Sequence, residues 1–331
     1  MKFKETAGID VSKKTIDVVL HLAGDHKQFE NKPKGFRAFI KWAEKNSGFS
    51  INSILICFEH TGLYSLPLAM HLSEHKIAYC MVAALEIKRS LGIVRGKNDK
   101  VDAGRIAAYA HLRKETLSCH KLPSQNVLKL QKLLALRERM VKQRAGYKAG
   151  LKEFKALIKR KDNELLFKTQ EQMIVQLDKQ INKVNKELIT IVDQDECLNR
   201  LYGLVTSVKG IGFVLALNFL VITNCFNNFE NSRQFACYSG IAPFEKQSGS
   251  SLNSKARVSH FANKKMKSLL NMGASSAIQY DPELKSYYQK RIEIGKSKMS
   301  TLNIVRNKIV ARVFAVVKRG TPYVSLHQHV A

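Results

Sequence analysis

The stretch "AGIDVSKKTIDVVLHLA", residues 7–23, decides the fold class of the first part of the chain. It contains two short apolar runs, residues 7–11 and 15–23, separated by the polar residues Ser-Lys-Lys. Short apolar runs on either side of a polar turn predict a β-hairpin. The segment "HKQFE" that follows, residues 26–30, is expected to add a third antiparallel strand.

Strand and helix patterns alternate through the rest of the first 115 residues. A helical period begins near Pro33, because proline is favoured at a helix start. Two more strands are predicted at "SILICFE" and "IAYCMVA", and two more helices at "LPLAMHLSEH" and "DKVDAGRIAAYAHLRK". The order β-β-β-α-β-α-β-α predicts an α/β domain over residues 1–120, with a mixed sheet flanked by helices.

A different pattern runs from Leu122 to about Asp195, rich in Lys, Arg, Leu and Gln. Between Ile174 and Ile191 the apolar residues recur in alternating steps of three and four, which is typical of a coiled-coil seam. The polar break "KRKDNE" near Asp162 predicts that two long helices fold back as an antiparallel hairpin over residues 121–197. Such a hairpin exposes an apolar stripe, which a second copy of the chain could cover.

Residues 198–331 are expected to form a mostly helical C-terminal domain. Its segment "LVTSVKGIGFVLALNFLVIT" resembles a helix-hairpin-helix, whose glycine turn presents backbone amides to a phosphate. The candidate contacts in this turn are Lys209, Gly210 and Gly212. A plain glycine turn between two core helices is the alternative interpretation.

The charge of the chain indicates a polyanionic partner. Its 331 residues carry 55 Lys+Arg against 27 Asp+Glu, a formal net charge of +28. A balance this basic is typical of proteins that bind nucleic acid. Residues 244–331 alone contain 16 Lys+Arg and 4 acids, which predicts a surface for a phosphate backbone. The candidate contacts there are Lys255, Arg257, Lys264 and Lys265.

A membrane partner is disfavoured. No apolar run approaches the roughly 20 residues that a spanning helix needs. The N-terminal residues lead directly into an apolar strand, without a signal-peptide pattern. The six cysteines are scattered and form no C-x-x-C pair, so reduced thiols in a cytoplasmic protein are expected.

Four acids stand out against the basic background. Asp10 lies within the first apolar strand, and Glu59 ends the strand "SILICFE". Asp99 and Asp102 begin a helix with an i, i+3 spacing, which places both on one face. If these elements meet, four carboxylates form one cluster that suits Mg²⁺ or Mn²⁺, and a metal pair about 4 Å apart suits in-line phosphoryl transfer.

Each acid also has a simpler interpretation. Asp99 as N-cap with Asp102 at N3 is good helix-start chemistry. Asp10 could begin a turn with Ser12, and Glu59 could pair with a lysine. Actin-like and sugar-kinase ATPases open with a similar hairpin, but their phosphate turn needs a glycine after the aspartate, and "DVSKKT" has none. The order of the four acids along the chain is instead that of the RNase H-like, RuvC-type nuclease fold.

A Ser-Gly-Ser-Ser loop, residues 248–251, precedes the basic C-terminal segment. A serine hydroxyl beside cations that neutralise phosphate could act as a nucleophile toward a phosphodiester. A loop whose hydroxyls are solvated or bound to backbone is the alternative.

Across essentially its whole length, the chain resembles the DEDD insertion-sequence transposases of the IS110 family. The matching segments are "GIDVSKKTIDV", "CFEHTGLYSLPLAMHL", "GKNDKVDAGRIA", "VKGIG" and "RQFACYSGIAPFEKQSGSS" with its basic tail. The last of these is the most specific, because RuvC-like nucleases in general lack it.

The resemblance implies a RuvC-like domain in which Asp10, Glu59, Asp99 and Asp102 bind the metal. It also implies that Ser248 is the nucleophile that links covalently to DNA, with Ser250 and Ser251 as alternative positions. Such recombinases move their own element with a structured bridge RNA that pairs with donor and target DNA. They work as dimers that assemble into tetramers, with the acids and the serine of a composite site drawn from different subunits.

Two other functions fit part of the pattern. A RuvC-type endonuclease that cuts branched DNA with metal-activated water would use the acids and leave the serine segment without a role. A non-enzymatic nucleic-acid-binding relative would use the charge alone, with its acids only capping and pairing.

Overall fold

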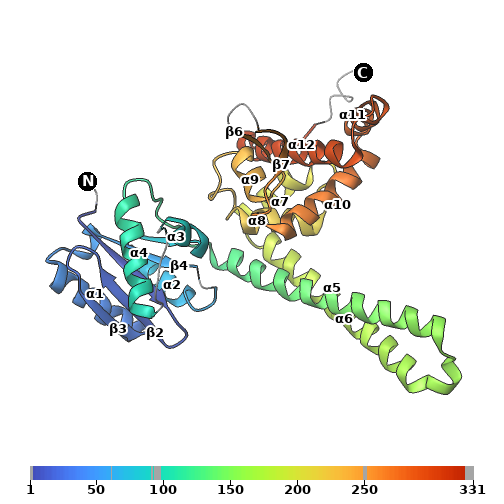
Figure 1. The fold of residues 1–331 in the computed structure, drawn as a ribbon. Helices are drawn as coiled ribbons and strands as arrows, with labels where there is room; N and C mark the ends of the chain where they lie inside the picture. Colours follow the sequence, from blue (N-terminus) through green and yellow to red (C-terminus); the bar gives the residue numbers. More distant parts are fainter. Residues whose placement is uncertain (1–2, 61, 91, 93–97, 249–251, 325–331) are drawn as a thin grey trace. The chain divides into compact units, whose positions relative to one another are not determined.

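The computed structural model describes residues 3–60, 62–90, 92, 98–248 and 252–324. The chain forms two compact units, Met1–Leu122 and Pro123–Ala331 (Figure 1). The division of the second unit near residue 197 into a helical hairpin and a C-terminal domain stays a prediction.

The first unit is built on a mixed five-stranded sheet. Its strands are β1 (Glu5–Val11), β2 (Thr15–Leu20), β3 (His26–Glu30), β4 (Ile54–Glu59) and β5 (Tyr79–Val82). They lie in the order β3-β2-β1-β4-β5, with β1, β2 and β3 antiparallel and with β4 parallel to both β1 and β5. The predicted hairpin and third strand are therefore confirmed, and so is the mixed α/β class.

The alternation of residues along β1 separates the two faces of the sheet. Ala7 and Ile9 pack into a core with helices α1 (Pro33–Ser47) and α2 (Leu66–Glu74). Gly8 faces the other side, where helix α4 (Asp99–Arg113) packs across β1, β2 and β4. Apolar side chains of β4, β5 and α4 form a second, smaller core on that side.

Two short elements of this unit were not predicted, the 3-10 helix η1 (Ile51–Ser53) and helix α3 (Ala84–Ser90). Helix α3 has seven residues, of which only Ile87 is buried. A segment this short shows too few repeats for a helical period to be recognised in the sequence.

The second unit begins with two long helices, α5 (Gln125–Leu157) and α6 (Glu164–Asp193). The short helix η2 (Arg160–Asn163) joins them where the sequence predicts a break. Three polar contacts join the helices: Lys129 with Glu187, Arg137 with Asn185, and Arg144 with Asp178. The residue numbers rise along α5 while they fall along α6, so the two helices are antiparallel. Ile181, Leu188 and Ile191 of the predicted seam are buried.

The rest of this unit is mostly helical. Its helices are α7 (Glu196–Thr206), α8 (Phe213–Ile222), α9 (Ser232–Tyr238), α10 (Lys264–Tyr280), α11 (Pro282–Glu293) and α12 (Lys298–Arg319). They enclose an apolar core, and an antiparallel two-stranded sheet, β6 (Pro243–Ser248) with β7 (Leu252–Val258), follows α9. Within the described residues, each helix is too short or too polar to cross a lipid bilayer.

Candidate active site

Asp10 and Glu59 lie at the ends of neighbouring parallel strands. The pairing of Gly8 with Cys57 fixes the register of β1 against β4. Because side chains alternate between faces, Asp10 and Glu59, each two residues further on, share the face that α4 covers. Both side chains are half-buried. The two predicted carboxylates therefore lie at the same end of the sheet and on the same face.

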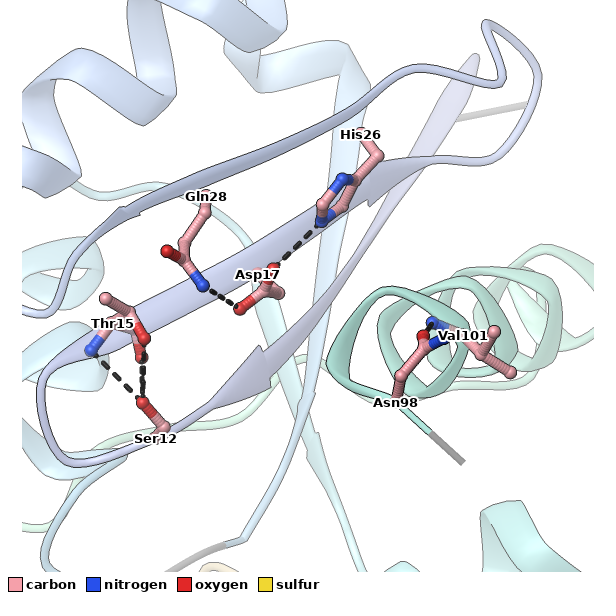
Figure 2. A network of polar contacts seen from close by, with 7 residues as sticks. All are labelled: Ser12, Thr15, Asp17, His26, Gln28, Asn98 and Val101. Atoms are coloured by element: carbon pink, nitrogen blue, oxygen red, sulfur yellow. Dashed lines mark hydrogen bonds and ion pairs between the residues drawn. The ribbon is translucent and has the colours of Figure 1, made fainter. Parts of the chain in front are cut away.

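The start of α4 brings the other two acids, with one correction to the expected cap. Asn98, not Asp99, is the N-cap, since its side chain accepts a hydrogen bond of 2.8 Å from the Val101 amide (Figure 2). The amide oxygen of the preceding residue thus takes the capping role that the simpler interpretation gave to the Asp99 carboxylate. Asp99 and Asp102 occupy the first turn, and Asp102 accepts a hydrogen bond of 2.7 Å from Arg105.

A glycine sets the distance between α4 and the sheet. A Cβ atom on Gly8 would lie 2.1 Å from the backbone nitrogen of Ala107 and 2.3 Å from the carbonyl oxygen of Ala103. The Thr6 hydroxyl donates to the Ala107 carbonyl at 3.3 Å, which ties the same turn of α4 to β1. The helix can therefore lie this close to the sheet only because residue 8 has no side chain.

The four acids share one electrostatic environment. The pKa of Asp10 is raised from 3.8 to about 6, first by burial and then by the negative charges of Asp99, Asp102 and Glu59, in that order. Among the described residues, no three of these carboxylates have oxygen atoms that all lie within 4.8 Å of one another. The acids are thus close enough to repel one another, yet they would have to draw together to chelate a single ion.

The chemistry of the donor set fits a hard divalent cation. Carboxylate oxygens are the ligands that Mg²⁺ and Mn²⁺ prefer. A bound cation would also offset the repulsion that raises the Asp10 pKa, because an opposite charge favours the ionised carboxylate.

One further acid, Asp17, was not singled out from the sequence. It is the direct cross-strand partner of Asp10 on β2 and adds to the charge that raises the Asp10 pKa. Its own carboxylate is buried and contacts the His26 and Gln28 side chains, both at 2.9 Å (Figure 2). The available signal was the repetition of Ile-Asp-Val in both strands of the hairpin.

In the second unit, the predicted glycine turn lies between α7 and α8. Gly210 has a φ of +91° and packs against α10, where an added Cβ would lie 2.5 Å from the Gly273 carbonyl oxygen. Lys209 and Gly212 are exposed. Gly210 thus has a packing role, and of the three predicted contacts only Lys209 and Gly212 lie open at the surface.

The serine segment forms the hairpin of β6 and β7. Ser248 ends β6, with its backbone opposite Leu252. Ser250 and Ser251 lie outside the described residues, as do the side chains of residues 246–255, which include Ser248 and Lys255.

The predicted basic contacts near this hairpin differ in their surroundings. Arg257 on β7 and Lys264 at the start of α10 are exposed. Lys265 is half-buried and forms an ion pair of 2.7 Å with Glu138 of α5. Lys265 would have to leave this pair to bind a phosphate.

Two family models match this chain. A model of DEDD transposases of the IS110 type, described as "Transposase", matches residues 7–157. A second, described as "Transposase IS116/IS110/IS902 family", matches residues 202–289. The first match contains all four acids, and the second contains the glycine turn and the serine hairpin.

Curated relatives agree with these matches. The chain is 27% identical to the pilin gene-inverting proteins of Moraxella lacunata and Moraxella bovis, over 97% of this chain and 98% of each relative. It is also 27% identical to the Insertion element IS110 uncharacterized 43.6 kDa protein of Streptomyces coelicolor, over 37% of this chain and 30% of that protein.

A mixed α/β unit with acids at two strand ends and at the start of the helix that covers them, together with these matches, defines the class as a DNA transposase or recombinase. Within that class, the chain belongs to the IS110 family of transposases.

Proposed function

We propose that this transposase cleaves and rejoins DNA strands with a divalent-cation centre held by Asp10, Glu59, Asp99 and Asp102. The observation that carries the proposal is the raised pKa of Asp10, because the other three acids, together with Asp17, are the charges that raise it beyond the effect of burial. The strand order β3-β2-β1-β4-β5, with three antiparallel strands first, supports an RNase H-like fold of the RuvC type.

The protein's own residues have defined tasks in this proposal. Asp10 and Glu59 are fixed by strand register, and Gly8 holds α4 close enough for Asp99 and Asp102 to join them. Mg²⁺ or Mn²⁺, when bound, would stabilise negative charge on the scissile phosphate. Arg105 neutralises part of the charge of Asp102.

The nucleophile we propose is Ser248. Its Oγ forms a bond to phosphorus while the bond from phosphorus to one nucleoside oxygen breaks. The hydroxyl proton is lost and the departing oxygen gains one, so the serine ester retains the energy of the phosphodiester. Strand exchange then needs no ATP, because the reverse reaction with a new DNA end releases the serine.

A covalent-adduct assay tests this role. Labelled DNA that contains the target site is incubated with the wild type, Ser248→Ala, Ser250→Ala and Ser251→Ala. Protein–DNA adducts are then separated under denaturing conditions. We expect loss of the adduct in Ser248→Ala alone, with unchanged circular dichroism. An adduct in Ser248→Ala would exclude this nucleophile, and cleavage without any adduct would favour a RuvC-type endonuclease that uses water.

We further propose that a structured bridge RNA selects donor and target DNA, and that the α5–α6 hairpin forms a coiled coil that joins two chains into a dimer, with tetramers on synapsed DNA. The basic composition and the family resemblance support RNA and DNA binding. Recombination in extracts with and without the transcript flanking the gene tests the guide. Equal activity without RNA would contradict it.

DNA inversion is a second candidate outcome of the same chemistry. Two relatives that align over almost their full length are named for inverting a pilin gene. A plasmid with two sites in inverted orientation distinguishes the outcomes, since inversion changes a restriction pattern and transposition moves the element to a new replicon.

A further inference from the structure

The last turn of α2 carries three potential metal ligands that the carboxylate cluster does not use. His71, Glu74 and His75 each have a ligand atom within 4.8 Å of those of the other two. Their i, i+3, i+4 spacing places them on one side of the helix. Helix α2 packs on the face of the sheet opposite to α4, so this group is separate from the four acids.

The imidazole of His71 is buried without a hydrogen-bond partner for one nitrogen. The residue is 6% exposed, and its Nε2 atom is buried with no partner among the described residues. Leaving a buried polar atom unpaired costs about 1–3 kcal/mol, so such an atom points to a ligand. Burial also lowers the pKa of the His71 imidazole.

The neighbouring histidine is oriented for coordination. His75 Nδ1 lies 2.8 Å from the His71 carbonyl oxygen. A carbonyl oxygen only accepts, so Nδ1 must carry the proton, and Nε2 of the neutral ring is left with its lone pair. A second ring nitrogen that donates to a backbone carbonyl is the usual support of a metal-binding histidine.

The position in the helix favours a cation. His75 is the C-cap residue of α2, where the negative end of the helix dipole lies. Glu74 is exposed and adds a carboxylate, while Arg37 of α1 is the nearby positive charge that opposes binding. The two rings are 4.2 Å apart at their centroids, so both imidazoles lie side by side at this end of the helix.

We propose that His71, Glu74 and His75 bind a Zn²⁺ ion that fastens the end of α2. Two imidazole nitrogens and a carboxylate oxygen suit Zn²⁺, at about 2.0–2.2 Å, and leave a fourth position for water. Mg²⁺ and Mn²⁺, which prefer oxygen ligands, belong at the carboxylate cluster instead. An ion that binds only the folded chain would stabilise it.

Zinc titration of the full chain without a histidine tag tests the proposal. Calorimetry and thermal unfolding are measured for the wild type, His75→Ala, Glu74→Gln and Asp10→Asn. The exposed His260 in the second unit provides a matched control, His260→Ala. We expect zinc to raise Tm in the wild type, His260→Ala and Asp10→Asn, and His75→Ala to weaken binding about 100-fold or more.

Two results would overturn the proposal: zinc affinity unchanged in His75→Ala, or zinc binding abolished by Asp10→Asn, which would assign the ion to the carboxylates. Because His75 is exposed, its replacement leaves the core intact. The imidazole proton resonances provide a second readout, since zinc must shift those of His71 and His75 and leave that of His260 in place.

Discussion

Gly8 of β1 lies directly against the backbone of Ala107 in α4, so close that a Cβ atom on Gly8 would be 2.1 Å from the Ala107 nitrogen. The close contact is with backbone, and no side-chain change in α4 can relieve it. The same contact holds the helix that carries Asp99 and Asp102 against the strand that carries Asp10. The packing of one glycine and the geometry of the acids are therefore linked.

Replacing Gly8 by alanine tests this link. We expect Gly8→Ala to lower the free energy of unfolding by about 3 kcal/mol or more, because overpacking against backbone forces α4 away from the sheet. Mn²⁺ affinity should fall in the fraction that remains folded. A Cβ atom on Gly104 of α4 would meet nothing within 4 Å, so Gly104→Ala is the control. Its free energy of unfolding should rise by up to about 1 kcal/mol, because alanine favours the helix more than glycine does. Equal stability of the two variants in urea unfolding would contradict this account.

Metal binding should depend on pH through Asp10. Its pKa is raised to about 6, so below that pH a proton competes with the cation. We expect the apparent Mn²⁺ affinity to fall up to about tenfold per pH unit below pH 6 and to level off above pH 7. Isothermal titration from pH 5 to 8 in two buffers measures both affinity and proton release. An affinity that does not change between pH 5 and 7 would be inconsistent with Asp10 as a ligand.

Metal-free stability should show the opposite trend. Because the folded-state pKa of Asp10 lies above its ordinary value of 3.8, the folded chain holds the proton more tightly than the unfolded chain. The Asp10 carboxyl group therefore stabilises the folded chain below about pH 4, and this stabilisation is lost as the pH rises through 6. Thermal unfolding in EDTA at several pH values, compared with Asp10→Asn, isolates it.

In the second unit, Arg312 of α12 bridges two acids at the start of α11. It donates to Asp281 at 2.7 Å and to Glu283 at 2.6 Å, and Asp281 is buried. Arg312→Ala leaves a buried carboxylate without its cation, so we expect a loss of about 3–5 kcal/mol in unfolding free energy. Lys168 makes an exposed pair with Glu164, and Lys168→Ala should leave Tm essentially unchanged.

The base of the serine hairpin is anchored by two asparagines of α12. Asn303 and Asn307 donate to the carbonyl oxygen of Ile241, at 2.8 and 3.0 Å, just before β6. Replacing both by alanine should accelerate proteolysis within the β6–β7 hairpin and reduce covalent attachment to DNA. Asn227→Ala removes only a local contact to Asn224 and is the control. Unchanged proteolysis in the double variant would show that the anchor is dispensable.

The sequence predicted the sheet and its helices because their signals are local and strong. The two apolar runs around Ser-Lys-Lys, the proline near residue 33 and the break at "KRKDNE" are each patterns of a few neighbouring residues. The approach of α4 could not be predicted in this way, because Gly8 and Ala107 lie far apart in the chain and only the folded sheet brings them together. The alternative interpretation placed the N-cap at Asp99 and not at Asn98 for a different reason, since two adjacent residues both suit that position.

Pairing within the fold also changed the interpretation of single residues. Gly210 was a candidate phosphate contact, yet α10 packs against the position where a side chain of residue 210 would lie. Lys265 was a candidate cation for DNA, yet Glu138 of α5 holds it. These partners lie far away in sequence, so no local pattern identifies them.

The most direct test of the carboxylate centre is Mn²⁺ binding to three forms of the full chain, followed by electron paramagnetic resonance. These are the wild type, Asp10→Asn, and Asp25→Asn, which makes the same charge change at an exposed turn of the same unit. We predict tight binding in the wild type and Asp25→Asn, and at least about tenfold weaker binding in Asp10→Asn, with Tm in EDTA at or above that of the wild type. Equal Mn²⁺ affinity in all three forms would contradict a metal centre built on Asp10.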